Sequence, residues 1–282
     1  MEVDRYAAGV EYFGKNYNGW QIQKSTNETV QSKVEQALTK IADIKINTIC
    51  AGRTDSGVNA LSQVIHFDSQ QKRTLKAWKD GANSILPDDI KLIWVKRVSN
   101  EFHARFSAVK RTYKYFILND DSTSIFYKNK TTLVKDKINL ENMKEASKFL
   151  IGEKDFSSFR SSGCQSKTPI REIFEINFTK KKKLISIEIS ANAFLLNMVR
   201  IIIGTLLDFG LNDKDPKKMK SIIESRDRNL SGKTLAASGL YFIGPEYPGE
   251  FKIKKPPVKH SVLPILELSI SKFLSFPIKD LL

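Results

Sequence analysis

The sequence predicts an α+β protein made of two related halves. Runs of alternating apolar residues, typical of half-buried strands, are interleaved with stretches whose apolar residues recur every three or four positions, as on one face of a helix. A similar order of strand, helix and further strands is repeated after Arg111. We therefore expect an N-terminal α+β domain at 1–108, a C-terminal α+β domain at 109–250 and an extension at 251–282.

The first half contains four expected strands and two expected helices. Strand-like residues lie at 6–13, 49–51, 63–67 and 90–98. Thr29 opens a helical stretch that continues to about Ile41. A second helix is expected between Leu75 and Ile85, ending before Pro87. The glycine-bounded loop at 52–57 thus connects two strands.

The second half repeats these elements. Strands are expected at 111–118, 170–178, 184–190 and 240–243. The lysine run at 180–183 indicates a hairpin turn between two of them. Helices are expected at 140–150 and 194–209, the latter closed by Gly210, and Asp215 and Pro216 open a third.

Composition indicates a partner with many negative charges. The formal net charge is +15, and the excess of Lys and Arg is spread over the chain, which favours nucleic acid or an acidic membrane surface. Two cysteines are too few for a disulfide framework or a zinc site. Because the chain begins without a signal-peptide pattern and contains no apolar run of membrane-spanning length, we expect a cytoplasmic protein without a membrane partner.

The loop at 52–57 contains the candidate for chemistry. Asp55 follows Gly52-Arg53-Thr54 and precedes Ser56-Gly57. The flanking glycines allow a tight backbone turn close to a ligand, where an aspartate can act as nucleophile or base. The structural alternative is a turn in which Asp55 hydrogen-bonds its own backbone.

The string at 52–60 resembles a signature of the tRNA pseudouridine synthases that modify uridines 38, 39 and 40 of the anticodon arm, usually called TruA. It matches Gly-Arg-Thr-Asp-(Ala/Ser)-Gly-Val-His-Ala except at Asn59. Further segments match in the family's order, and the resemblance covers about residues 4–248. These segments are Tyr17-Asn18-Gly19-Trp20-Gln21, Phe102-His103-Ala104-Arg105-Phe106, Arg111-Thr112-Tyr113-Lys114-Tyr115, Asn192-Ala193-Phe194-Leu195 with Met198-Val199-Arg200, and Gly239-Leu240-Tyr241.

The resemblance implies that the protein isomerises uridine to pseudouridine in tRNA. Asp55 would be the catalytic nucleophile, Tyr113 would stack on the target uracil, and Arg200 would pair with Asp55. The implied fold has two halves whose antiparallel sheets join across a central cleft, and the implied assembly is a homodimer.

The resemblance also implies residues that bind the RNA. Arg53 would assist base flipping, and Leu240 would pack beside the uracil. Arg105 and Arg111 lie in matched segments and are further RNA-binding candidates.

Residue chemistry agrees with these roles. The reaction breaks the N1–C1′ bond and forms a bond at C5 without redox change, so it requires neither a metal nor a cofactor. A nearby arginine favours the ionised aspartate that the chemistry needs. Arg200 stands in an otherwise apolar helix, where a charge needs solvent or a partner. Tyr113 can instead be a packing residue of its strand.

Three other classes of protein fit parts of the sequence. Asp55-Ser56-Gly57 matches the triplet of aspartic proteases, but Arg53 and Thr54 replace the apolar residues expected before it, and helices are plentiful. A P-loop at 232–234 lacks its first glycine, because Asp227 stands there. A non-catalytic basic RNA-binding module keeps the charge and the aromatic residues, and only loss of activity on changing Asp55 separates it from an enzyme.

The final segment, 256–282, is rich in apolar residues. Glu267, Lys272 and Lys279 interrupt it before it reaches membrane-spanning length. We expect it to dock on the protein's own core or on a dimer partner.

Overall fold

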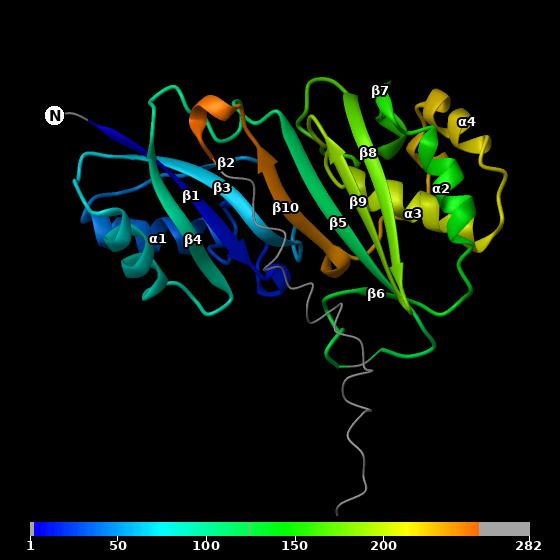
Figure 1. The fold of residues 1–282 in the computed structure, drawn as a ribbon, viewed down its shortest axis with the longest axis horizontal. Coiled ribbons are helices and arrows are strands. Elements are labelled where there is room, and N and C mark those ends of the chain that lie inside the picture. The colour runs from blue at the N-terminus through cyan, green and yellow to red at the C-terminus, as the bar shows by residue number, and fades with distance from the viewer. Residues whose placement is uncertain (1–2, 124, 254–282) are drawn as a thin grey trace, which may run out of the picture.

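One continuous sheet of ten strands runs through the computed structural model, which describes residues 3–123 and 125–253. Eight strands follow one another across it, and two short strands lie beside this row (Figure 1). In spatial order the eight are β4 (Ile90–Val98), β1 (Asp4–Tyr12), β3 (Asn59–Ser69), β10 (Leu240–Glu246), β5 (Lys110–Asn119), β9 (Leu184–Ala191), β8 (Ile170–Lys181) and β7 (Gly152–Asp155). The short strands are β2 (Ile49–Cys50), paired with β3, and β6 (Thr132–Val134), paired with β5.

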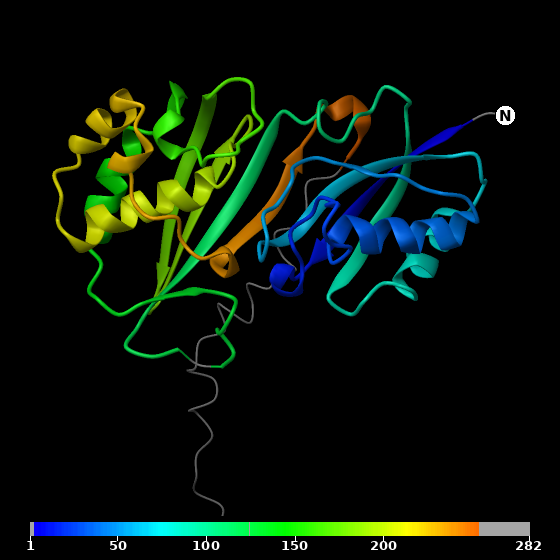
Figure 2. The ribbon, with the colours of Figure 1, turned by 180° about the vertical axis from the view of Figure 1, so that it is seen from behind.

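Helices cover one face of this sheet. In the N-terminal half, α1 (Val30–Ala42) begins where the Thr29 hydroxyl accepts the Ser32 amide, at 3.3 Å. A π-helical turn, η2 (Ala77–Gly81), follows later in the same half. In the C-terminal half the helices are α2 (Leu140–Lys148), α3 (Met198–Leu211) and α4 (Lys218–Ser225). Figure 2 shows α1 and α3 on the same side of the sheet.

Strand β10 joins the two halves, although it comes late in the sequence. It pairs in parallel with β3 through only Tyr241 with Asn59 and Phe242 with Ala60. On its other edge it pairs antiparallel with β5, beginning at Leu240 opposite Tyr115. The main apolar cluster likewise contains buried residues from both halves. The expected α+β class and mostly antiparallel sheet are confirmed.

Several element boundaries differ from the expectation. β6 and β7 were not expected. α3 begins at Met198 instead of residue 194, because Asn197 adopts a left-handed conformation with φ of 59°. α3 also continues through Gly210, where a Cβ atom would lie 2.7 Å from Met143. Gly210 therefore allows close helix packing and does not end the helix.

Two other predicted boundaries move by a few residues. β8 and β9 extend to Lys181 and Leu184, so the hairpin turn is shorter than 180–183. Asp215 lies before α4 and accepts the Lys217 amide at 3.0 Å, while the helix itself starts at Lys218.

The division at residue 108 stays a prediction, because the sheet and the main apolar cluster continue across it. The proposed docking of 256–282 lies outside the described residues. Within 3–123 and 125–253, no helix has the length and apolar character needed to cross a membrane.

Candidate active site

Asp55 lies on the loop between β2 and β3, and neighbouring side chains hold this loop. The Gln63 amide bonds Gly52 in both directions, donating to its carbonyl at 2.5 Å and accepting from its N–H at 3.4 Å. The hydroxyls of Tyr12 and Thr54 are 2.7 Å apart in the protein interior. These hydrogen bonds anchor the backbone on the N-terminal side of Asp55.

The segment at 17–21 packs directly on this loop. The Trp20 N–H donates to the Thr54 carbonyl at 3.0 Å, and the Tyr17 carbonyl accepts the Ser56 hydroxyl at 3.2 Å. Gly19 has φ of 85°, and a Cβ atom there would lie 2.7 Å from the Thr54 carbonyl oxygen. The segment at 17–21 thus supports the loop at 52–57, and both belong to the motifs matched in the sequence.

Asp55 faces Arg200 across the site. Arg200 Nη1 is 3.8 Å from Asp55 Oδ2. The guanidinium is itself fixed, with Nε donating to the Leu235 carbonyl and Nη1 to Asn197 Oδ1, both at 2.7 Å. Burial raises the pKa of Asp55, and the positive charge of Arg200 opposes this rise. Arg200 therefore favours the ionised carboxylate.

Tyr113, on β5, is buried beside the same site. Its ring centroid lies 4.8 Å from that of Phe242 and 5.1 Å from that of Phe194, the latter edge-to-face. Burial and, secondarily, the negative charge of Asp55 raise the pKa of Tyr113. The phenol therefore stays protonated at neutral pH and can donate a hydrogen bond.

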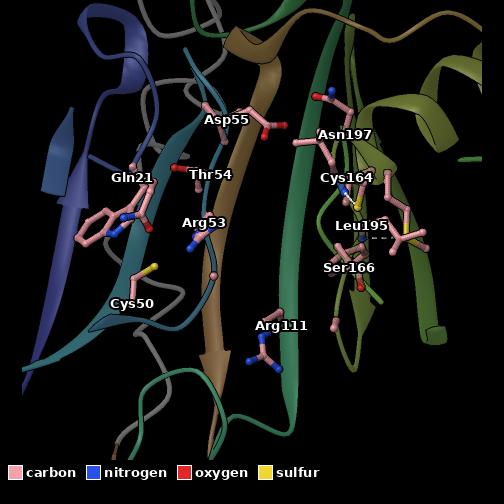
Figure 3. A pocket seen from close by; sticks show the side chains of 18 of the residues that line it. Gln21, Cys50, Arg53, Thr54, Asp55, Arg111, Cys164, Ser166, Leu195 and Asn197 are labelled. Atoms are coloured by element: carbon pink, nitrogen blue, oxygen red, sulfur yellow. Dashed lines mark hydrogen bonds between the residues drawn. The ribbon is translucent and has the colours of Figure 1, made fainter. Parts of the chain in front are cut away.

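These residues line one cavity of about 1060 Å³, ample for a nucleotide. Leu240 lies in its wall. Asp55 is the sole carboxylate among the described residues that line it, and five arginines surround the space. The arginines are Arg53, Arg105, Arg111, Arg171 and Arg200. Figure 3 shows Asp55 near one end and Arg111 near the other.

Arg53 and Arg105 are exposed at the cavity. Arg53 Nη1 donates to Gln165 Oε1 at 3.1 Å, which connects the loop of Asp55 to the C-terminal half. The Arg105 guanidinium lies 5.5 Å from the ring centroid of Phe106. Both arginines can therefore meet RNA at the rim. Gln165 was not expected at the site, since no charge or motif distinguishes it in the sequence.

Arg111, unlike Arg53 and Arg105, uses its guanidinium for hydrogen bonds to several backbone carbonyls. Its guanidinium donates to the carbonyls of Ala51, Ala108 and Asn192 at 2.7–3.3 Å, and also to that of Arg105. Burial lowers its pKa. Since Ala51 precedes the loop of Asp55 and Asn192 follows β9, Arg111 connects the two walls of the cavity.

Asn59, which replaces the histidine of the signature, is buried away from the cavity lining. Its Oδ1 accepts the Gly14 N–H at 2.9 Å, and its Nδ2 donates to the Ser238 carbonyl at 3.1 Å. The amide thus connects the start of β3 to the turn that precedes β10.

The cavity of this α+β protein is built on one mixed sheet and lined by five arginines, with Asp55 as the sole carboxylate among its described lining residues, so it is suited to bind a polyanion such as RNA. A family model described as tRNA pseudouridine synthase matches residues 8–107 and 146–248.

Individual relatives make this classification more specific. The tRNA pseudouridine synthase A of Francisella tularensis subsp. tularensis is 45% identical over 257 residues, which are 91% of this chain and 99% of the relative. That of Buchnera aphidicola subsp. Schizaphis graminum is 46% identical over 250 residues, 88% of this chain and 94% of the relative. The chain belongs to the tRNA pseudouridine synthase A family. It is an isomerase that converts uridine to pseudouridine in tRNA.

Proposed function

We propose that this synthase modifies uridine at positions 38, 39 and/or 40 of the tRNA anticodon arm, with Asp55 as its nucleophile. The observation that carries the proposal is the position of Asp55, the sole carboxylate among the described cavity residues, 3.8 Å from an anchored arginine. A carboxylate must be ionised to act as a nucleophile, and Arg200 favours that form.

The chemistry balances without a second substrate. The N1–C1′ bond breaks and a C5–C1′ bond forms. The C5 proton leaves, and N1 gains a proton. As the nucleophile, the Asp55 carboxylate forms a transient bond to a sugar or base carbon, and this bond breaks again before the product leaves. Tyr113 presents its ring to the uracil while Leu240 packs beside the base. Base–aromatic stacking contributes about 1–3 kcal/mol, which offsets part of the unstacking that precedes the reaction.

The RNA-binding roles follow from the positions of the arginines. Arg53, on the catalytic loop, fills the space that the flipped uridine vacates. Arg105 meets the backbone at the rim. Arg111 supports binding by holding the walls together, because its donors already engage protein carbonyls.

Labelled tRNA tests the assignment of positions. A transcript carrying tritium at uracil C5 should release label in proportion to new pseudouridine, and mapping should place the product at 38, 39 or 40. Product confined to another arm of the tRNA would contradict the anticodon-arm assignment and leave the synthase activity standing.

We further propose that the enzyme is a homodimer that acts on tRNA in the cytoplasm. The family resemblance supports this assembly. Sedimentation equilibrium should give twice the chain mass. A single-chain mass at micromolar concentration would contradict the dimer.

A further inference from the structure

A tight turn at residues 103–107 stands at the end of the cavity remote from Asp55. Arg105 in this turn lines the cavity, and its carbonyl accepts a hydrogen bond from Arg111. Figure 3 shows Arg111 well away from Asp55 along the length of the cavity. The turn can therefore contact a part of the RNA other than the target uracil.

Hydrogen bonds fix the conformation of this turn. His103 Nδ1 accepts the N–H groups of Arg105 and Phe106 at 3.2 and 3.1 Å. The backbone of His103 bonds Ser107 twice, donating to its hydroxyl at 3.0 Å and accepting its N–H at 2.9 Å. A ligand that binds here would meet a preformed surface, so little ordering entropy opposes binding.

The turn presents Phe106 to solvent. The His103 ring stacks on it, with centroids 4.3 Å apart and an interplanar angle of 25°. Phe106 nevertheless remains 75% exposed. A rigid turn that holds a largely exposed aromatic ring, with His103 stacked on it and the Arg105 guanidinium 5.5 Å from its centroid, is suited to receive another flat ring.

We propose that Phe106 and Arg105 form a nucleotide subsite that binds a tRNA base adjacent to the target uridine. The base stacks on Phe106, and the phosphate of the same nucleotide lies against the Arg105 guanidinium. The inference rests on the tRNA substrate of the proposed function but is independent of the role of Asp55.

Physical chemistry favours RNA over a protein partner at this turn. Aromatic platforms beside cationic side chains are typical of surfaces that bind single-stranded nucleic acid, because any base can stack and every phosphate carries charge. Flipping the target also removes a stacking partner from its neighbour. A platform for that neighbour therefore lowers the free energy needed to open the stack.

Binding measurements on variants that cannot turn over test the subsite. In an Asp55→Asn background, Phe106→Ala should weaken binding of an anticodon stem-loop about 5- to 100-fold, the range that stacking of one base supplies. Phe106→Trp should restore the affinity. Val109→Ala is the matched control, since Val109 is 53% exposed and lies three residues away without an aromatic ring, and it should bind like the parent.

A second experiment identifies the base that stacks on Phe106. Replacing the nucleotide beside the target by an abasic residue should weaken binding to the parent, and Phe106→Ala should then add little. Equal losses from Phe106→Ala and Val109→Ala, unchanged affinity in Phe106→Ala, or a change in oligomeric state without a change in RNA affinity would each overturn the subsite. Failure of the proposed function would appear separately, as turnover by the Asp55→Asn parent.

Discussion

Burial and Arg200 act on Asp55 in opposite directions. Burial prevails, so the pKa of Asp55 is raised above its usual value. A carboxyl whose pKa is raised by folding contributes stability at low pH and loses that contribution as the pH rises through the folded-state pKa. Wherever Asp55 is ionised in the folded protein, its burial therefore lowers the free energy of unfolding.

The pH profile of Arg200 variants tests this balance. Arg200→Ala removes the opposing charge, so the pKa of Asp55 should rise further and the acid limb of kcat/KM should move to higher pH. A charge about 4 Å away contributes about 1–4 kcal/mol, so the acid limb should move by about 1–3 pH units. Arg200→Lys should shift the limb less. An acid limb unmoved in Arg200→Ala would contradict the coupling.

At the scale of single residues, the sequence predicted most members of the candidate site but not every contact that they make. The motifs placed Asp55, Arg200 and Tyr113 together, and the structure brings all three to one cavity. The bonds of Arg111 to carbonyls of both halves were not predictable, because they depend on the backbone of distant segments.

At the scale of elements, the loop of Asp55 depends on the segment at 17–21. Gly19 lies against the Thr54 carbonyl in a backbone conformation that residues other than glycine rarely adopt. Any Cβ atom there must displace the loop of Asp55 or strain its own backbone. The geometry of Asp55 is thus set partly by a residue without a side chain.

Substituting Gly19 should therefore affect both stability and activity. Gly19→Ala should lower the free energy of unfolding by about 1–3 kcal/mol and reduce kcat. Gly163→Ala is the control for stability, because Gly163 has a similar φ of 78° but no atom within 4 Å of its Cβ position. Thermal denaturation should show the larger loss for Gly19→Ala. Equal losses in the two variants would mean that the contact with Thr54 is unimportant.

The sequence predicted the long elements and the two-residue strand β2, but it missed the short strands β6 and β7. β1, β4 and α1 have clear repeats and caps, and they lie where expected. β6 and β7 span three and four residues, which are too few to show an alternation of apolar and polar side chains. Gly210 was misread as a helix end because a glycine required for close packing looks the same in sequence as a terminator.

At the scale of the whole molecule, the position of β10 determines the site. This strand lies between β3 and β5 and thereby places Leu240 in the cavity wall. The sequence predicted the strand β10 but not its position in the sheet. Its parallel pairing with β3 consists of two residue pairs that are far apart in the sequence, and such pairs leave no local sequence pattern.

The positive charge of the molecule should make tRNA binding strongly dependent on salt. If four phosphates are neutralised, affinity should fall about a hundredfold between ~50 and ~200 mM salt. Arg105→Gln should reduce the slope of log Kd against log salt by about one. Lys79→Gln, outside the cavity lining, should leave the slope unchanged. A slope near zero in the wild type would show that the basic surface does not bind the RNA.

We propose that Asp55 performs the chemistry and contributes little to tRNA binding, and tritium release from C5-labelled tRNA by the Asp55→Asn variant tests this most directly. The substitution removes the only carboxylate among the described cavity residues but retains its shape and the arginines around it. Label release should fall to background, while tRNA affinity stays within about threefold of wild type because phosphate contacts dominate binding. Release at the wild-type rate by a folded Asp55→Asn variant would contradict the account.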